Sequence, residues 1–436
     1  MSTFTLIWLG QLISLVGTGL TRFTLGVWVF QETGSVTRFA LIALFATLPT
    51  GLFLPVSGAL VDRWNRRWVM MISDSIAALA TLGLLFFYLT GHLVTWHIYV
   101  AVAIQAAASA FQWPAYAASI PILVPKEHLG RASGMVQSAH ALTEIAAPAL
   151  GGALLGAVGL QGVIALDLLS FLFAVTMLLL VRIPQPARTT AGAAGQGTLR
   201  HESLYGWRYI LARPGLLALL TYFATINFVY AMSQVLITPL VLSFTTEQVL
   251  GLVLATGGAG AVLGSALMAV WGGPRRRVYG VLLFGSLMSL SLFIMGARPV
   301  AFLVAVGSFI SLLGVPIISG CNQAIWMQRV EPDLQGRMAA IRAFLGASTL
   351  PTAYLLAGPL ADRIFEPLLR ANGPLAGSVG QVIGVGPGRG IAFLLMILGL
   401  IPLLASFIAY RYPRLRFVED DLPDTLNIKE HAPEGA

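Results

Sequence analysis

The chain has 436 residues, of which 57% are hydrophobic and only 10% are charged, and its mean hydropathy is +0.82. Because soluble domains carry about a quarter charged residues, this composition excludes an ordinary soluble protein and predicts a membrane protein. The formal net charge is +8, and the single cysteine, Cys321, excludes a disulfide framework and any multi-cysteine metal site.

Twelve mostly apolar stretches are each long enough to predict a membrane-spanning helix, for which about 18 residues suffice. The first, 4–30, is too long and too poor in basic residues at its start for a signal peptide. The others are 39–61, 68–90, 94–123, 132–160 and 162–181 in the first half, and 216–244, 248–272, 278–296, 299–326, 338–361 and 390–410 in the second. We therefore expect an all-α membrane protein with an N-terminal six-helix half (1–182), a cytoplasmic linker (183–215), a C-terminal six-helix half (216–411) and a cytoplasmic tail (412–436).

Five ionisable side chains lie within the predicted spans of the first half, where an uncompensated charge costs at least a few kcal/mol. They are Arg22, Asp74, His140, Glu144 and Asp167. Glu144 lies near the middle of the fifth span, with His140 one turn earlier on the same face, so this pair is the first candidate for carrying a proton. Asp74 and Asp167 lie nearer helix ends, which favours pairing or capping. Arg22 lies nearer the outer end of the first span, and its long side chain either reaches towards the centre of the membrane or snorkels to the outer headgroups.

Neutral polar side chains mark other predicted spans, and the second half has no acid inside a span. The candidates for a substrate cavity are Gln105 in the fourth span, Asn227, Tyr230 and Gln234 on one face of the seventh, and Asn322 with Gln323 in the tenth. A mostly apolar wall with scattered polar groups suits bulky amphipathic molecules. For Asn227 and Gln234, polar contacts between helices are the alternative interpretation.

Lys and Arg are distributed unevenly between the predicted loops. If the N-terminus is cytoplasmic, 20 of the 26 lie in cytoplasmic segments and 5 in outer segments, the last being Arg22. This bias predicts a multi-pass protein of the cell membrane with both termini in the cytoplasm. Since the basic residues are not interleaved with aromatics, the positive charge suits anionic lipid and not a nucleic acid.

The two halves carry traces of an internal repeat. When the sequence is aligned with itself at a shift of 206 residues, Gly51 aligns with Gly257, Gly58 with Gly264, and Gly152 with Gly358. The loop "DRWNRR" after the second span also corresponds, with a small gap, to "GGPRRR" after the eighth. Two pseudo-symmetric halves are typical of alternating-access transporters, whose substrate binds between the halves near the membrane midplane.

The loop between the second and third spans reads "GALVDRWNRR". It resembles the signature loop of the major facilitator superfamily, with Asn65 where that family has glycine. Asn tolerates the left-handed turn that glycine would supply. The resemblance implies a conformational latch in which the aspartate meets the N-terminus of a helix in the other half and the arginines engage nearby carboxylates. The latch residues are Gly58, Asp62, Arg63, Arg66 and Arg67. On charge alone, a plain loop with positive-inside arginines is an equally good interpretation.

Several longer segments resemble the macrolide-efflux and siderophore-exporter-like branch of that superfamily. They are "FQWPAYAASIPILVPKEHLGRASGM" (111–135), "LAGPLADRIFEPL" (356–368), "GVGPGRG" (384–390) and "VEDDLPD" (418–424). In the fifth span, "APALGG" with Pro148, Gly151 and Gly152 resembles an element of drug and proton antiporters, except that Ala147 replaces its first glycine. Ordinary small-residue packing is the alternative. The arginine that such antiporters carry in the fourth span is absent, and Gln105 is the main polar residue there.

No motif for an enzyme, an ATP site or a metal site is present in the sequence. We therefore expect a secondary transporter without cofactors, acting as a monomer, which exports hydrophobic or amphipathic small molecules such as drugs, macrolides or siderophores in exchange for protons. Two alternatives remain: an importer or lipid transporter of the same superfamily, and a membrane enzyme or assembly factor that transports nothing.

Overall fold

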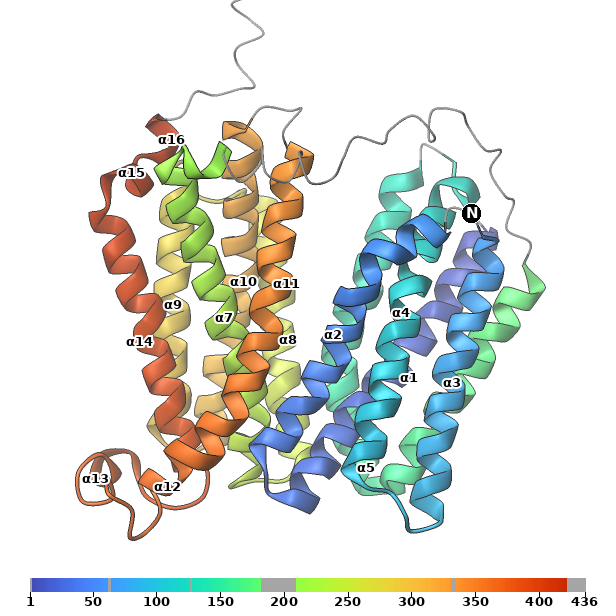
Figure 1. Ribbon diagram of the computed structural model, residues 1–436, viewed down its shortest axis with the longest axis horizontal. Coiled ribbons are helices and arrows are strands. Elements are labelled where there is room, and N and C mark those ends of the chain that lie inside the picture. Colours follow the sequence, from blue (N-terminus) through green and yellow to red (C-terminus); the bar gives the residue numbers. More distant parts are fainter. Residues whose placement is uncertain (1, 62–63, 126–127, 182–208, 331–334, 422–436) are drawn as a thin grey trace, which may run out of the picture.

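The computed structural model describes residues 2–61, 64–125, 128–181, 209–330 and 335–421, and every regular element within these ranges is a helix. Figure 1 shows two helical bundles side by side. The first bundle contains α1 (Ser2–Thr33), α2 (Val36–Val61), α3 (Arg66–Leu89), α4 (Thr95–Leu123) and α5 (Leu129–Leu180). The second contains α7 (Pro214–Leu242), α8 (Glu247–Trp271), α9 (Arg277–Ala297), α10 (Ala301–Arg329), α11 (Gln335–Pro359) and α14 (Arg389–Arg411).

Short helices lie at the two ends of the second bundle. Between α11 and α14 the chain forms the π-helix η3 (Leu360–Phe365), α12 (Glu366–Leu368) and α13 (Val379–Ile383), and after α14 it forms α15 (Pro413–Arg416) and α16 (Val418–Asp421). The start of α1 and the helices α15 and α16 lie at the end of the molecule that is uppermost in Figure 1, which we call the terminal face. The helices α12 and α13 lie at the opposite end, the distal face.

By length and composition, nine of the described helices can cross a membrane, namely α1, α2, α3, α5, α7, α8, α9, α10 and α14. The sequence predicted twelve spans. α5 has 52 residues and contains two of them, because a single backbone break at Gly159 (φ 68°, ψ 179°) separates its two parts. α4 and α11 are long, with 29 and 25 residues, but are not among the nine.

The start of α3 differs from the expectation for its loop. Asn65 has φ −70° and ψ 113°, so it is extended and not left-handed. Its side-chain oxygen accepts hydrogen bonds from the backbone N–H groups of Arg67, at 3.0 Å, and Trp68, at 3.4 Å. Asn therefore acts as an N-cap, which glycine has no side chain to do. The expectation of a left-handed turn at this position was wrong.

Packing within each bundle is dense, and the two bundles meet along two seams. α1 packs on α5 and α2 on α4 in the first bundle, while α10 packs on α8 and α9 in the second. Between the bundles, α2 packs against α11 and α5 against α8. Large apolar side chains such as Leu79, Phe86, Leu180 and Leu252 are exposed, as expected for surfaces that face lipid.

Candidate functional site

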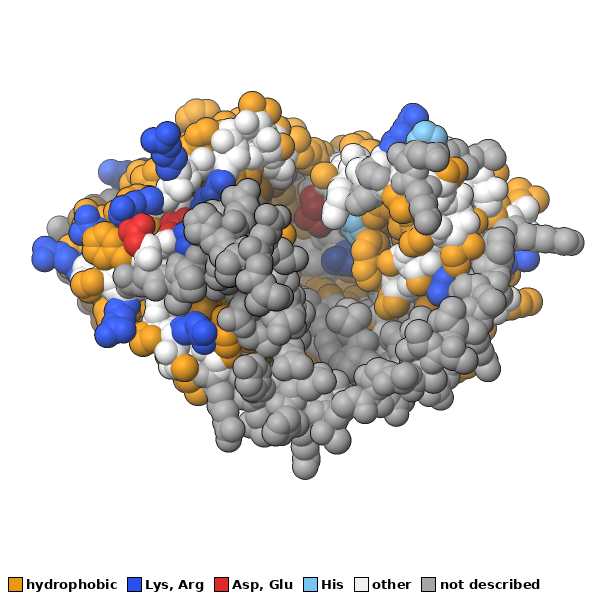
Figure 2. Space-filling view, turned by 90° about the horizontal axis from the view of Figure 1, so that it is seen from above, with side chains coloured by type: hydrophobic (Ala, Val, Ile, Leu, Met, Phe, Trp, Pro, Cys, Tyr) orange, Lys and Arg blue, Asp and Glu red, His pale blue; other side chains and the backbone are white. Residues whose placement is uncertain are grey.

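A cavity of about 460 Å³, which we call the main cavity, lies near the contact between the bundles. Figure 2, seen from the terminal face, shows a hollow between the two bundles with acidic, basic and histidine side chains inside it. Most of its wall comes from α1, α2 and α5, with Thr238 contributed by α7. Its charged and polar lining residues include Thr18, Arg22, His140, Thr143 and Glu144, and its apolar ones include Phe23, Phe39 and Ile42.

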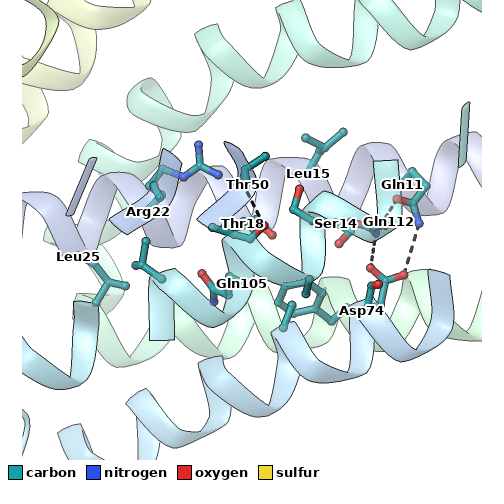
Figure 3. A pocket seen from close by; sticks show the side chains of 18 residues that line it. Gln11, Ser14, Leu15, Thr18, Arg22, Leu25, Thr50, Asp74, Gln105 and Gln112 are labelled. Carbon is teal, nitrogen blue, oxygen red and sulfur yellow. Dashed lines mark hydrogen bonds between the residues drawn. The ribbon is translucent and has the colours of Figure 1, made fainter. Parts of the chain in front are cut away.

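Arg22 points into this space. Its side chain is exposed and lines both the main cavity and a smaller neighbouring one of about 140 Å³, which we call the side cavity. Figure 3 shows its guanidinium at the end of the side cavity, on α1. The two sequence interpretations of Arg22 were a side chain reaching towards the centre of the membrane and one snorkelling to the outer headgroups. In this structure Arg22 lines both cavities.

Glu144 and His140 also line the main cavity, one turn apart on α5. Glu144 is exposed and is the acidic residue in the described lining. The His140 ring makes an edge-to-face contact with Trp113, with centroids 5.3 Å apart, which orients the imidazole from α4. The predicted pair therefore lies together with Arg22 around one cavity, so a basic and an acidic side chain face the same space.

The side cavity is polar and lies within the first bundle (Figure 3). Asp74 is 2% exposed there and accepts hydrogen bonds from two amide side chains, the Nε2 of Gln112 and, at 3.5 Å, the Nε2 of Gln11. Gln112 Nε2 also donates to Gln11 Oε1 at 3.1 Å. Gln105 lies in the same wall and donates to Thr81 Oγ1 at 2.8 Å. The network joins α1, α3 and α4, which agrees with the structural pairing role favoured for Asp74.

Replacing Gln112 by leucine should lower the free energy of unfolding by about 1–3 kcal/mol, because a buried acceptor on Asp74 loses its donor. Thermal unfolding of purified protein in detergent measures this. Adding Asp74→Asn should recover much of the loss, since the unsatisfied carboxylate is then gone. Strictly additive costs of the two substitutions would contradict a shared network.

Asp167 is not among the lining residues of these two cavities. It is fully buried against α1, where a Cβ on Gly17 would lie 2.9 Å from Asp167 Oδ1. Ser170 Oγ donates to the Asp167 backbone carbonyl at 2.7 Å and lies 3.5 Å from Oδ1. Glycine at position 17 is what lets the carboxyl sit this close to α1. Asp167 is thus a packing residue between α1 and α5 in this conformation.

The polar candidates of the second bundle are not in the described walls of these cavities. Asn322 is 1% exposed, and its Oδ1 accepts a hydrogen bond from Trp326 Nε1 at 3.2 Å. Asn227 Nδ2 donates to the Phe223 carbonyl one turn earlier, at 3.0 Å. Tyr230 and Gln234 are partly buried on α7. For Asn322 and Asn227 the structure thus shows contacts within a helix.

The glycine element of the fifth span lies at the seam with α8. A Cβ on Gly152 would be 2.5 Å from the Glu247 carbonyl oxygen, and one on Gly251 would be 2.5 Å from the Pro148 carbonyl oxygen. Each helix thus presents a glycine to the backbone of the other. Small residues allow such close helix approach, so this element holds the bundles together where α8 begins.

The loop between α2 and α3 is described only in part. Asp62 and Arg63 lie outside the described residues, and Gly58 lies in the last part of α2. Arg66 Nη1 donates to the Ala118 carbonyl at 2.7 Å, and Arg67 donates to the carbonyls of Leu178 and Leu179 at 2.8 and 2.7 Å. Both arginines bind backbone carbonyls of their own bundle. Those of Leu178 and Leu179 lie in the last turn of α5, where carbonyls have no partner within the helix and the helix dipole is negative. That the arginines of this loop engage carboxylates stays a prediction, since part of the loop lies outside the described residues.

Gln11 and Gln112 were missed by the sequence analysis, although they hold Asp74. The available signal was the amide itself, since an uncharged polar group inside a span also needs a partner.

Long apolar helices, two bundles and a charged cavity between them define a membrane transporter of the kind in which two halves enclose the substrate. A model of the "Major Facilitator Superfamily" matches residues 7–353, so the chain belongs to this family of transporters. The predicted family is therefore confirmed, and the enzyme alternative is set aside because these proteins are transporters.

Curated relatives and a solved structure agree with this assignment. "Macrolide efflux protein A" of Streptococcus pyogenes is 28% identical over 83% of this chain and 90% of its own. "Multidrug efflux pump Tap" of Mycolicibacterium fortuitum is 27% identical over 82% of this chain and 88% of its own. A bacterial homologue of the human lysosomal transporter Spinster, solved in an inward-facing, unoccupied conformation, superposes with a TM-score of 0.71 and 14% identity, covering 97% of this chain and 99% of that one. The structural likeness shows the fold alone.

Proposed function

We propose that this protein is a secondary active transporter that exports hydrophobic or amphipathic small molecules, of drug, macrolide or siderophore type, in exchange for protons. The observation that carries the proposal is the main cavity, where Glu144 and Arg22 face a space that also has an apolar wall and is hollowed towards the terminal face. The macrolide and multidrug efflux relatives support the substrate class and the outward direction.

The proposed topology has twelve spans in two six-helix halves, 1–182 and 216–411, with the linker and both termini in the cytoplasm. The distribution of Lys and Arg supports it, since 20 of 26 then lie on the cytoplasmic side. The terminal face is then cytoplasmic. A cavity that is hollowed there corresponds to the state that collects substrate for export.

Coupling to protons is assigned to Glu144, with His140 beside it. A carboxyl exposed to a cavity within the membrane can take up or release a proton as the cavity changes sides, and Arg22 on α1 lines the same cavity. The substrate and the proton then compete for the same binding site. Asp74 and Asp167 are secondary candidates, because one is held by two amides and the other lies outside the described cavity walls.

The test is transport by purified protein in proteoliposomes with an imposed pH gradient, preceded by a drug and siderophore sensitivity screen in an efflux-deficient host. Substrate movement from the side of the terminal face, accompanied by opposite proton movement, supports the proposal. Net uptake of nutrients, or movement of labelled lipid between leaflets, would favour the importer or lipid-transporter alternative.

A second expected result concerns the proposed cytoplasmic latch. Asp62→Asn should slow turnover several-fold, because a charge at a helix N-terminus contributes about 0.3 to 1 kcal/mol and several such contacts bias two conformations without freezing either. Cysteine labelling of the main cavity from the terminal face should rise. Unchanged labelling together with unchanged transport would leave this segment as a loop that only sets topology.

A further inference from the structure

The distal end of α11 repeats a pattern of the latch loop. The sequence is "GALVDR" at 58–63 and "GPLADR" at 358–363, identical at four of six positions. This pairing is not the internal repeat of 206 residues, since the two segments are 300 positions apart. The first copy begins in the last turn of α2, and the second ends α11 and forms part of η3. The helices α2 and α11 pack against each other across the contact between the bundles.

The aspartate of the second copy caps a helix of the opposite bundle. Asp362 Oδ1 accepts from the backbone N–H of Val36 at 3.0 Å, and Oδ2 accepts from the backbone N–H of Thr37 at 2.9 Å and from Ser35 Oγ at 2.8 Å. The backbone N–H of Arg38 in turn donates to Ser35 Oγ at 3.2 Å. Val36 and Thr37 are the first residues of α2, and the N–H groups of a helix's first turn have no partner within their own helix. A carboxylate meets both this need and the positive end of the helix dipole.

The backbone is arranged so that this contact can form. A Cβ on Gly358 would lie 2.3 Å from Thr37 Cα, so only glycine lets the end of α11 come this close to the start of α2. Asp362 itself lies in the π-helix η3, an uncommon widening that is frequent at functional positions and turns the side chain towards α2. A further contact between the bundles joins α1 and α8, where Gln31 Nε2 donates to Glu247 Oε2 at 3.3 Å.

We propose that Asp362 is the distal counterpart of the Asp62 latch: it holds the two bundles together at the distal face and releases when that face opens. α2 starts and α11 ends at this contact, so the two helices run in opposite directions. Asp362, at the C-terminal end of α11, meets the N-terminal end of α2, and in the proposed cytoplasmic latch Asp62 meets the N-terminal end of a helix in the other half. Rocking the bundles about the middle of this pair breaks one contact as it makes the other. The inference rests on the proposed alternating access.

The experiment places one thiol in the main cavity, by Ala43→Cys in a Cys321→Ala background, and measures its labelling by an impermeant maleimide added from each side of the membrane. Ala43 lines the main cavity on α2. Asp362→Asn should raise labelling from the distal side about three- to tenfold and lower it from the terminal side, because one state loses a charged cap. A protein that is merely destabilised would label faster from both sides.

Two further variants sharpen the result. Val36→Pro removes the Val36 N–H that donates to Asp362 while leaving the Asp362 side chain unchanged, and proline is well accepted at the first position of a helix. It should shift labelling in the same direction by a smaller factor, and it carries the test if Asp362→Asn fails to fold. Glu32→Gln is the matched control, since Glu32 is an exposed acid near the end of α1 on the same face. Its labelling should equal that of the parent protein.

The outcomes separate the latch from the transport function. Distal labelling that is unchanged in both Asp362→Asn and Val36→Pro, in protein whose labelling still responds to substrate, would overturn the latch and leave the transporter in place. Absence of transport by the parent protein for every compound screened, together with labelling from one side only in all variants, would overturn alternating access and the latch with it.

Discussion

Replacing Glu144 by glutamine should abolish substrate accumulation driven by a pH gradient while leaving substrate binding and downhill exchange in place. Glutamine keeps the size of the side chain and its hydrogen-bonding capacity but cannot exchange a proton. A gradient of one pH unit is worth about 1.4 kcal/mol per proton, so the loss amounts to about a tenfold fall in accumulation for each proton exchanged. Uptake into proteoliposomes with and without the gradient measures it.

Two variants serve as comparisons for Glu144→Gln. His140→Ala should weaken pH-driven transport less, because His140 lines the cavity beside Glu144 but is not the carboxyl. Asp167→Asn should keep pH-driven transport, since Asp167 is buried against α1 and lies outside the described cavity walls. Full pH-driven transport by well-expressed Glu144→Gln protein would refute the assignment, and Asp74, which lines the side cavity, would become the next candidate.

Replacing Gly152 by leucine should lower transport at least about fivefold by forcing α5 and α8 apart. The first added carbon would meet the Glu247 carbonyl oxygen at 2.5 Å, and a backbone atom cannot move aside as the tip of a side chain can. Overpacking of this kind costs about 1–3 kcal/mol, which is a five- to more than hundredfold change in the balance between the two states. Labelling of Ala43→Cys from the distal side should rise.

The control for Gly152→Leu is Gly83→Ala on α3, where an added Cβ meets no atom within 4 Å. It should leave transport and labelling as they are. Gly156→Ala is an intermediate case, because the Cβ would meet the flexible end of Gln248 at 2.4 Å. Normal transport by Gly152→Leu would show that the α5–α8 seam is not required for closing the distal face.

The sequence by itself determined the class of structure and most of the helix limits. Residues 68–90 and 390–410 were predicted as spans, and the structure has helices at Arg66–Leu89 and Arg389–Arg411. The break between the fifth and sixth spans was expected near residue 161 and lies at Gly159. These features depend on local properties. A helix makes all its backbone hydrogen bonds within itself in lipid, and an apolar segment long enough to cross the membrane can be identified from the sequence alone. The signature loop likewise indicated the family.

Only the tertiary structure decided which polar groups face a cavity. Arg22, Glu144 and His140 line the main cavity, whereas Asp167 and Asn322 are buried in packing contacts. In spans that are apolar all round, the sequence has no strong amphipathic face to set the rotation of each helix about its axis. That rotation is set by neighbours, through contacts such as Gly17 against Asp167 and Gly152 against α8, between residues that are far apart in the chain. The capping of α2 by Asp362 across 325 or more positions depends on the same packing, because two bundles must meet before a carboxylate on one can reach the free N–H groups of the other.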